Sequence, residues 1–164
     1  MESRLEGERR LIASSGERLS LPRDPTVEQL REVFRPDVIQ EVVHEFYQSV
    51  RADSLLGPVF ETRIGDWPTH LRRMTLFWGT ILRAEPGFHP SPRGNPAQLH
   101  RLIHELEPSH FDRWLTLFGE VCRGSLHPSA AEHMVTRASR IALVLSAHLT
   151  PATPVASSPR EVDG

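Results

Sequence analysis

Tyrosine, histidine and tryptophan side chains that could bind a small ligand are spread along this chain. Tyr47, His70 and Trp114 carry O–H or N–H groups, which can donate hydrogen bonds to a ligand with partial negative charge. His100 carries an imidazole, and neutral imidazole is the commonest protein ligand of metal ions. Each of the four stands at the edge of a helical apolar pattern. Brought together by a fold, they would supply one axial ligand and several donors to a haem that binds a small gas.

Apolar residues that could enclose such a ring accompany these polar groups. Phe60 is a candidate for the aromatic ring that packs flat on the macrocycle, and Met74 follows His70 by one helical turn. The candidate cofactor-binding residues are Phe60, His70, Met74, Phe77, Trp78, Leu99, His100 and Trp114, with His100 as the metal ligand and Tyr47, His70 and Trp114 beside the gas.

Each candidate also has an ordinary structural interpretation. Tyr47 and Trp114 could be core aromatic residues whose polar atoms reach backbone carbonyls. His70 could lie on a helix surface, and His100 could be a half-buried histidine at a helix edge. Taken singly, each residue favours the ordinary interpretation, and only the whole set indicates a haem pocket.

Other chemistries find less support in the sequence. His100 and His104 stand one turn apart and Glu105 follows, so that a zinc pair is an alternative. However, the H-E-x-x-H order is missing and no further ligand stands at a suitable spacing. Cys122 lies on an apolar helix face, where a thiol is inert core rather than a nucleophile. The sequence contains no phosphate loop, dinucleotide signature or G-x-S-x-G motif.

Helices are predicted to position these residues. Apolar side chains recur at helical spacing over residues 27–34, 38–50, 70–81, 99–106, 111–122 and 131–149. Asp37, Asp66 and Ser109 can cap three of these helices, Asn95–Pro96 can begin the short one, and Pro128–Ser129 can begin the last. Because no comparable period-2 segment occurs, the predicted fold class is all-α with about five main helices.

Two glycines are expected to interrupt the helices. Gly57 and Pro58 close a connection, after which Phe60 stands as an isolated aromatic residue. Gly124 is expected to end the helix that contains Cys122.

Composition indicates one domain in a reducing compartment. The chain has 164 residues, a formal charge of −2 and a pI of about 6.5, so that no strong field would attract nucleic acid or an anionic membrane. No apolar run is long enough to span a bilayer, and the N-terminus lacks the apolar core of a secretory signal. Because Cys122 is the single cysteine, no internal disulfide and no C-x-x-C-H haem attachment can form. We expect a cytoplasmic protein that holds haem without thioether links.

The two ends differ from the middle of the chain. Residues 1–25 are rich in Glu, Arg and Ser, and residues 150–164 are rich in Pro and Ser. Such segments cannot bury enough apolar surface to offset their ordering entropy. We therefore predict a flexible N-terminal extension over residues 1–25, a compact domain over residues 26–149 and a disordered C-terminal tail over residues 150–164.

Over residues 37–149 the chain resembles the group III truncated haemoglobins, which are two-over-two helical globins of bacteria. The matching segments, in order, are Phe46–Tyr47, residues 50–53, residues 55–60, Asp66–Trp67, His70–Leu71, Met74, Phe77–Trp78, residues 94–96, His100, residues 110–118 and residues 137–142. Their order and spacing, rather than any one segment, carry the resemblance. The loop over residues 85–93 looks longer than in the family, and Phe88–His89 stand where a tyrosine is common.

The resemblance implies a shortened globin-like sandwich of helices around haem b. It implies His100 as the proximal ligand, Tyr47, His70 and Trp114 around the bound gas, and Phe60 against the ring. The expected ligands are oxygen, nitric oxide and carbon monoxide.

Two kinds of activity and one haem-free alternative remain open. The first hypothesis is oxygen and nitric oxide chemistry, either nitric oxide dioxygenation or peroxide activation, with an external reductase because the chain has no flavin or nicotinamide domain. The second is a non-enzymatic oxygen carrier or gas sensor. The third is a helical interaction module without haem. We expect a monomer with no nucleic-acid or membrane partner.

Overall fold

Six helices and no strand occur in the part of the chain that the structure, a computed structural model, describes: residues 18–90, 99–100, 103, 105–147 and 149. The helices are α2 (Val27–Val33), α3 (Pro36–Ala52), α4 (Leu56–Arg63), α5 (Trp67–Arg83), α7 (Pro108–Ser125) and α8 (Pro128–Ala147). The prediction of an all-α fold is confirmed. None of the described helices is both long and apolar enough to cross a membrane.

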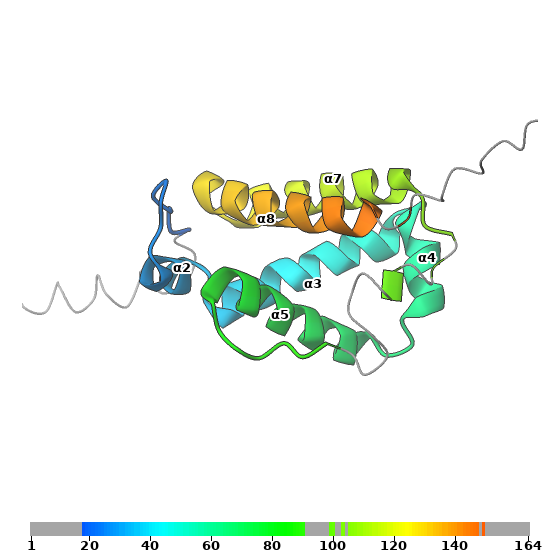
Figure 1. The fold of residues 1–164 in the computed structure, drawn as a ribbon, viewed down its shortest axis with the longest axis horizontal. Coiled ribbons are helices and arrows are strands. Elements are labelled where there is room, and N and C mark those ends of the chain that lie inside the picture. Colours follow the sequence, from blue (N-terminus) through cyan, green and yellow to red (C-terminus); the bar gives the residue numbers. More distant parts are fainter. Residues whose placement is uncertain (1–17, 91–98, 101–102, 104, 148, 150–164) are drawn as a thin grey trace, which may run out of the picture.

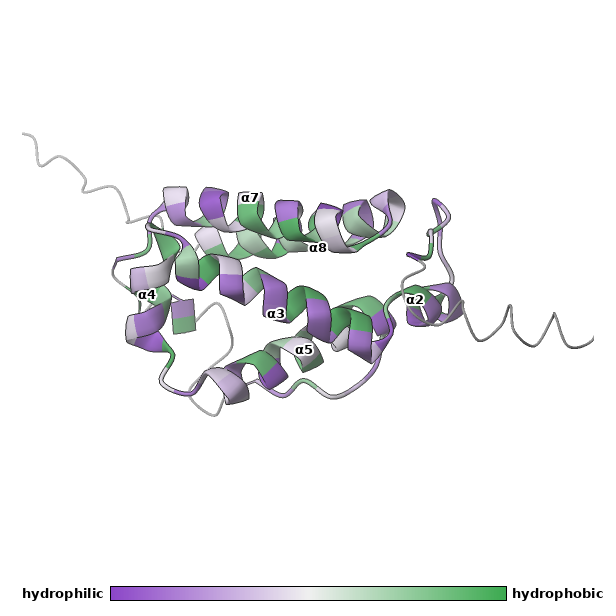
Figure 2. Ribbon diagram, turned by 180° about the vertical axis from the view of Figure 1, so that it is seen from behind, coloured by the Kyte–Doolittle hydropathy of each residue, from purple (hydrophilic) through white to green (hydrophobic). Residues whose placement is uncertain are grey.

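The long helices form two layers (Figure 1). α7 and α8 pack side by side in one layer, and α3 packs against α5 in the other. α3 also contacts α7 and therefore joins the layers, while α4 stands at the end of α3. Hydrophobic and hydrophilic residues alternate around these helices (Figure 2), as expected for helices that are buried on one side only.

Prolines decide where two of the helices begin. Pro36 and Pro108 occupy the first positions of α3 and α7, where a missing N–H costs little. The N-cap residues are therefore Arg35 and Glu107. The predictions that Asp37 and Ser109 cap these helices are wrong. Asp66 does cap α5, because its carboxylate accepts a hydrogen bond of 3.1 Å from the Thr69 N–H. Pro128 begins α8 as predicted.

α4 is a helix that periodicity did not predict, and Phe60 belongs to it instead of standing alone. Asp53 Oδ1 accepts hydrogen bonds of 3.0 Å from the N–H groups of both Leu55 and Leu56 at the start of the helix. A β-carbon at Gly57 would stand 2.8 Å from the carbonyl oxygen of Arg51, so that only glycine lets α4 approach the end of α3 this closely. α4 is thus fixed against α3 with Phe60 in a defined place.

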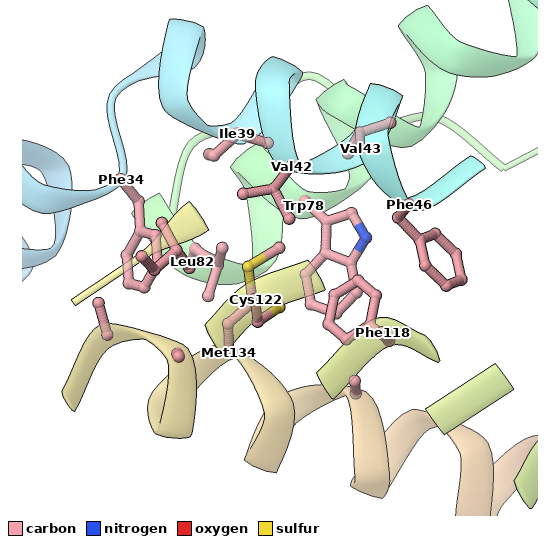
Figure 3. Packing of buried hydrophobic residues seen from close by; sticks show 14 of the residues in the cluster. Phe34, Ile39, Val42, Val43, Phe46, Trp78, Leu82, Phe118, Cys122 and Met134 are labelled. Atoms are coloured by element: carbon pink, nitrogen blue, oxygen red, sulfur yellow. The ribbon is translucent and has the colours of Figure 1, made fainter. Parts of the chain in front are cut away.

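The core lies between the two helical layers. Phe34, Phe46 and Phe118 are its largest fully buried side chains, and Cys122 lies among them beside Met134 (Figure 3). Burial raises the pKa of the Cys122 thiol to about 12. The thiol therefore stays protonated at neutral pH, which agrees with the interpretation of Cys122 as inert core. α7 ends at Ser125, one residue beyond the predicted stop at Gly124.

The N-terminal boundary of the packed domain differs from the prediction. Leu21 is only 7% exposed, and its N–H donates a hydrogen bond of 2.8 Å to Ser129 Oγ on α8. Residues 18–25 therefore do not belong to a flexible extension, because Leu21 packs into the core. The remainder of the predicted extension, the predicted C-terminal tail and the predicted start of a helix at Asn95–Pro96 lie outside the described residues.

Candidate functional site

An apolar cavity of about 250 Å³ opens between the helical layers. Side chains from α3, α4, α5, α7 and α8 line it, together with the segment around His100. All nine predicted site residues line this one cavity: Tyr47, Phe60, His70, Met74, Phe77, Trp78, Leu99, His100 and Trp114. The fold thus brings together residues that are spread over 68 positions of the sequence, from 47 to 114.

Tyr47 is a buried residue that brings a hydroxyl group to the cavity. Its side chain is 7% exposed, and its ring contacts the rings of His70 and Phe60 edge-on, with centroids 4.9 and 6.0 Å apart. Burial raises the pKa of Tyr47 well above its ordinary value. The hydroxyl therefore keeps its proton at every physiological pH. No hydrogen bond joins it to another residue in the described part of the chain, so that the proton is available to a ligand in the cavity.

His70 places an unpaired nitrogen in the same region. Its Nε2 atom is buried and has no hydrogen-bond partner among the described residues. Burial, and to a smaller extent the charges of Arg73 and His100, lower the pKa of His70 to about 4. At neutral pH the imidazole is uncharged, so that it offers one N–H donor and one acceptor nitrogen. A buried polar atom without a partner is costly in a folded protein, and a bound ligand would relieve that cost.

The lowered pKa of His70 predicts how stability depends on pH before any cofactor is bound. Between pH 6.5 and about 4, the unfolded chain binds a proton at this imidazole that the folded chain excludes. The free energy of unfolding should therefore fall as pH is lowered through this window. One proton contributes a slope of at most about 1.4 kcal/mol per pH unit.

Urea unfolding of the haem-free protein at several pH values, with and without His70→Leu, measures this contribution. The leucine variant keeps an apolar side chain of similar size and should show a shallower slope below pH 6.5. Equal slopes in the two proteins would mean that folding does not lower the pKa of His70.

Trp114 is held by a stack of aromatic rings. Its ring lies parallel to that of Phe118, with an interplanar angle of 2° and centroids 5.2 Å apart. Phe118 is stacked in turn on Trp78, which lies beside it between the two layers (Figure 3). Phe46 meets the Trp114 ring edge-on. Because Phe46 and Phe118 both contact the indole, its N–H has a defined position in the cavity wall.

His100 lines the cavity close enough to His70 for its charge to lower the pKa of that residue. The zinc alternative required His104, which lies outside the described residues. Within those residues, no group of three or more His, Cys, Asp or Glu side chains could hold a metal ion. The described residues therefore offer two imidazoles, His70 and His100, on one apolar cavity.

Comparison with known proteins identifies the family. No protein-family model matches the chain. The group 3 truncated hemoglobin ctb of Campylobacter jejuni is 30% identical over 93 residues, which cover 54% of this chain and 70% of that protein. The chain belongs to the group III truncated haemoglobins. The resemblance found in the sequence is thus confirmed.

Solved structures support the same assignment. The crystal structure of the group III truncated hemoglobin from Campylobacter jejuni matches this truncated haemoglobin with a TM-score of 0.67 and 27% identity, over 73% of this chain and 94% of that one. The group II truncated hemoglobin from Bacillus anthracis has a TM-score of 0.59 at 20% identity, over 75% of this chain and 92% of that one. The second match shows the shared globin-like fold alone.

Six further residues line the cavity of this truncated haemoglobin, and the site prediction did not include them. They are Arg73, Phe88, Phe111, Ile141, Ala142 and Leu145. Arg73 follows His70 by three residues and so shares its helix face, which the sequence could have indicated. Phe88 lies beyond α5, and its ring contacts Phe77 with centroids 5.2 Å apart. Nothing in the spacing of Phe88 shows that this loop residue returns to the cavity.

Trp67 supports the His70 side of the cavity from outside. The indole N–H donates a hydrogen bond of 3.4 Å to Glu61, and the guanidinium of Arg51 lies 4.5 Å above the ring. Arg51 and Glu61 also form an ion pair of 2.6 Å. The clamped indole meets the His70 ring edge-on at 5.8 Å and the Tyr47 ring at 5.9 Å. Trp67 therefore restricts how far the two donor side chains of this truncated haemoglobin can move outward.

Proposed function

We propose that this truncated haemoglobin holds haem b without covalent attachment, with His100 as the axial ligand, and binds small gases on the side of Tyr47, His70 and Trp114. The observation that carries the proposal is that all four residues line one apolar cavity, in which the buried Nε2 of His70 has no partner among the described residues. Membership in a haemoglobin family supports the same cofactor. When bound, haem supplies an iron centre for oxygen, nitric oxide and carbon monoxide.

The apolar lining and one cation would hold the ring. Phe60, Met74, Phe77, Trp78 and Leu99 line the cavity with hydrophobic surface, which suits a flat, largely apolar cofactor. Arg73 brings a guanidinium to the same lining, where it would pair with a carboxylate of the cofactor. The cavity volume of about 250 Å³ is below the range of about 300–1,000 Å³ for most ligand sites, so that some lining side chains would move outward on binding.

The buried donors favour polar gas ligands. A hydrogen bond to bound oxygen is worth about 1 kcal/mol, which is roughly five- to tenfold in the dissociation rate. The Tyr47 hydroxyl and the Trp114 N–H are both held by packing. Carbon monoxide is less polar and gains less from them. Slow release of oxygen suits chemistry on the bound gas better than transport.

The activity that we propose is oxygen and nitric oxide chemistry with an external reductase. Nitric oxide dioxygenation, which gives nitrate, and peroxide activation both need electrons from a donor. The alternative is a carrier or sensor of gas without turnover. A helical interaction module without haem is the remote alternative.

An absorption spectrum of the reduced, haem-loaded protein tests the cofactor first. We expect a sharp Soret shift when carbon monoxide is added, because a histidine-ligated haem with an accessible sixth position binds this gas. Failure of the purified protein to take up haem would defeat the proposal and leave the interaction module.

Nitric oxide consumption separates the enzyme from the carrier. The oxygen-loaded protein should consume about one equivalent of nitric oxide and then stop, unless a reductant is supplied. With a reductase and its electron donor, consumption should continue over many equivalents. A nitric oxide electrode records both phases. A single equivalent consumed even with an efficient reductant would favour a carrier or sensor.

A further inference from the structure

A second groove, with a volume of about 520 Å³, lies between residues 21–23 and α8. It shares no lining residue with the cavity around His70. The hydrogen bond from the Leu21 N–H to Ser129 Oγ fixes the N-terminal wall against α8. The groove is therefore part of the packed domain and is distinct from the proposed haem site.

Three arginines face this groove. Arg137 and Arg140 follow His133 by four and seven residues, so that all three lie along one row of α8. Arg23 contributes a third guanidinium from the opposite wall. The lining contains one carboxylate, Glu132. Two walls of the groove thus present positive charge to the same space.

No carboxylate of the described residues forms an ion pair with these guanidinium groups. Among the residues that the structure describes, neither Arg23, Arg137 nor Arg140 takes part in a hydrogen bond or an ion pair. Six other arginines do form ion pairs with described carboxylates, as in the bond of 2.7 Å from Arg113 to Asp53. The chain as a whole carries a formal charge of −2, so that the groove is a local concentration of positive charge in a slightly acidic protein.

His133 brings an imidazole to the same groove. Its Nε2 atom is buried and has no partner among the described residues, while its ring packs near Phe34, with centroids 6.0 Å apart. Burial and the charges of Arg137 and Arg140 lower the pKa of His133, so that its charged form is disfavoured. A bound anion would offset these charges and so favour the protonated form of the imidazole.

We propose that this groove binds a small phosphate-bearing anion with at least two negative charges. The oxygens of a phosphate point in tetrahedral directions and can accept bonds from guanidinium forks on both walls at once, whereas the two oxygens of a carboxylate lie in one plane. A groove of about 520 Å³ has the size of a small-molecule site, and it is closed on two sides by α8 and the N-terminal segment.

Titration calorimetry with inorganic pyrophosphate tests the proposal on the full-length, haem-loaded protein. The test variant is R137Q/R140Q, and the matched control is R72Q/R123Q, which removes the same charge from exposed positions on α5 and α7. We expect saturable binding by the wild type and the control, and a loss of at least about tenfold per guanidinium in the test variant. Equal weakening in both variants would indicate non-specific attraction and would overturn the proposal.

The imidazole signal of His133 gives a second readout that does not depend on stability. Its pKa, followed by NMR in the carbon monoxide complex, should rise when pyrophosphate is added, because a negative charge then faces Arg23, Arg137, Arg140 and the ring. The Glu132 carboxylate faces the groove in both states and does not account for a change. In R137Q/R140Q the addition should have no effect. A wild-type His133 signal that does not respond to saturating pyrophosphate would also overturn the proposal.

Discussion

Replacing His100 with alanine is expected to abolish tight haem binding, and with it the Soret shift on adding carbon monoxide. His100 lines the cavity and is the imidazole that we propose as the ligand of the iron. Removing a supporting group around a metal ligand costs about 10–100-fold in affinity, so that removing the ligand itself should cost more than about 100-fold. Haem titration followed by absorbance, with reduced spectra before and after carbon monoxide, measures both effects.

A chemical rescue separates ligation from folding. The variant His100→Gly leaves a space in which free imidazole can bind, and millimolar imidazole should restore the wild-type spectrum. His89→Ala is the matched control, because His89 is an exposed histidine outside the cavity lining. An unchanged spectrum in His100→Ala would show that another histidine, with His104 as the first candidate, is the ligand.

Local sequence rules predicted most of the helices but misplaced some of their ends. Asp66 was found as a cap because it precedes an apolar pattern and its carboxylate reaches the Thr69 N–H. Asp37 and Ser109 are equally good caps by residue type, yet Pro36 and Pro108 precede them. A proline at the first helical position moves the cap one residue upstream of itself. The position of the proline therefore decides which residue becomes the cap. The preference of single residue types for cap positions does not take this into account.

α4 shows where local rules fail. Its sequence contains Gly57 and Pro58, which are poor helix formers, and its apolar residues do not form a stripe. The helix is held by tertiary contacts: Asp53 binds its first N–H groups, and Arg113, 60 residues further along the chain, bonds to Asp53 at 2.7 Å. A contact over that distance cannot be inferred from the periodicity of a single segment.

The candidate site was predictable as a set of residues but not as a geometry. Tyr47, His70 and Trp114 could be chosen because family order and helical spacing indicated them together. The unpaired Nε2 of His70 and the clamp on Trp67 depend on how α3, α4 and α5 pack. The sequence does not show that Phe88 lines the cavity, because the direction of a side chain in a loop does not follow a periodic pattern. Packing between helices, rather than any one helix, supplies this information.

Changing Tyr47 to phenylalanine is expected to speed oxygen release by about five- to tenfold. The substitution removes one buried donor, and a hydrogen bond to the ligand is worth about 1 kcal/mol. Tyr47 is the only tyrosine in the chain, and its ring contacts with His70 and Phe60 do not require the hydroxyl. Because the hydroxyl bonds to no other described residue, its loss leaves no protein group unsatisfied, and the fold should be retained.

Stopped-flow displacement of oxygen by carbon monoxide gives the rate, and carbon monoxide dissociation serves as the internal control. Because carbon monoxide is less polar, its release should change much less than that of oxygen. Trp114→Phe and the double variant complete a double-mutant cycle, in which a shared ligand predicts effects that are not additive. An oxygen dissociation rate equal to that of the wild type would mean that the Tyr47 hydroxyl points away from the gas. The oxygen-binding donors would then be His70 and Trp114 alone.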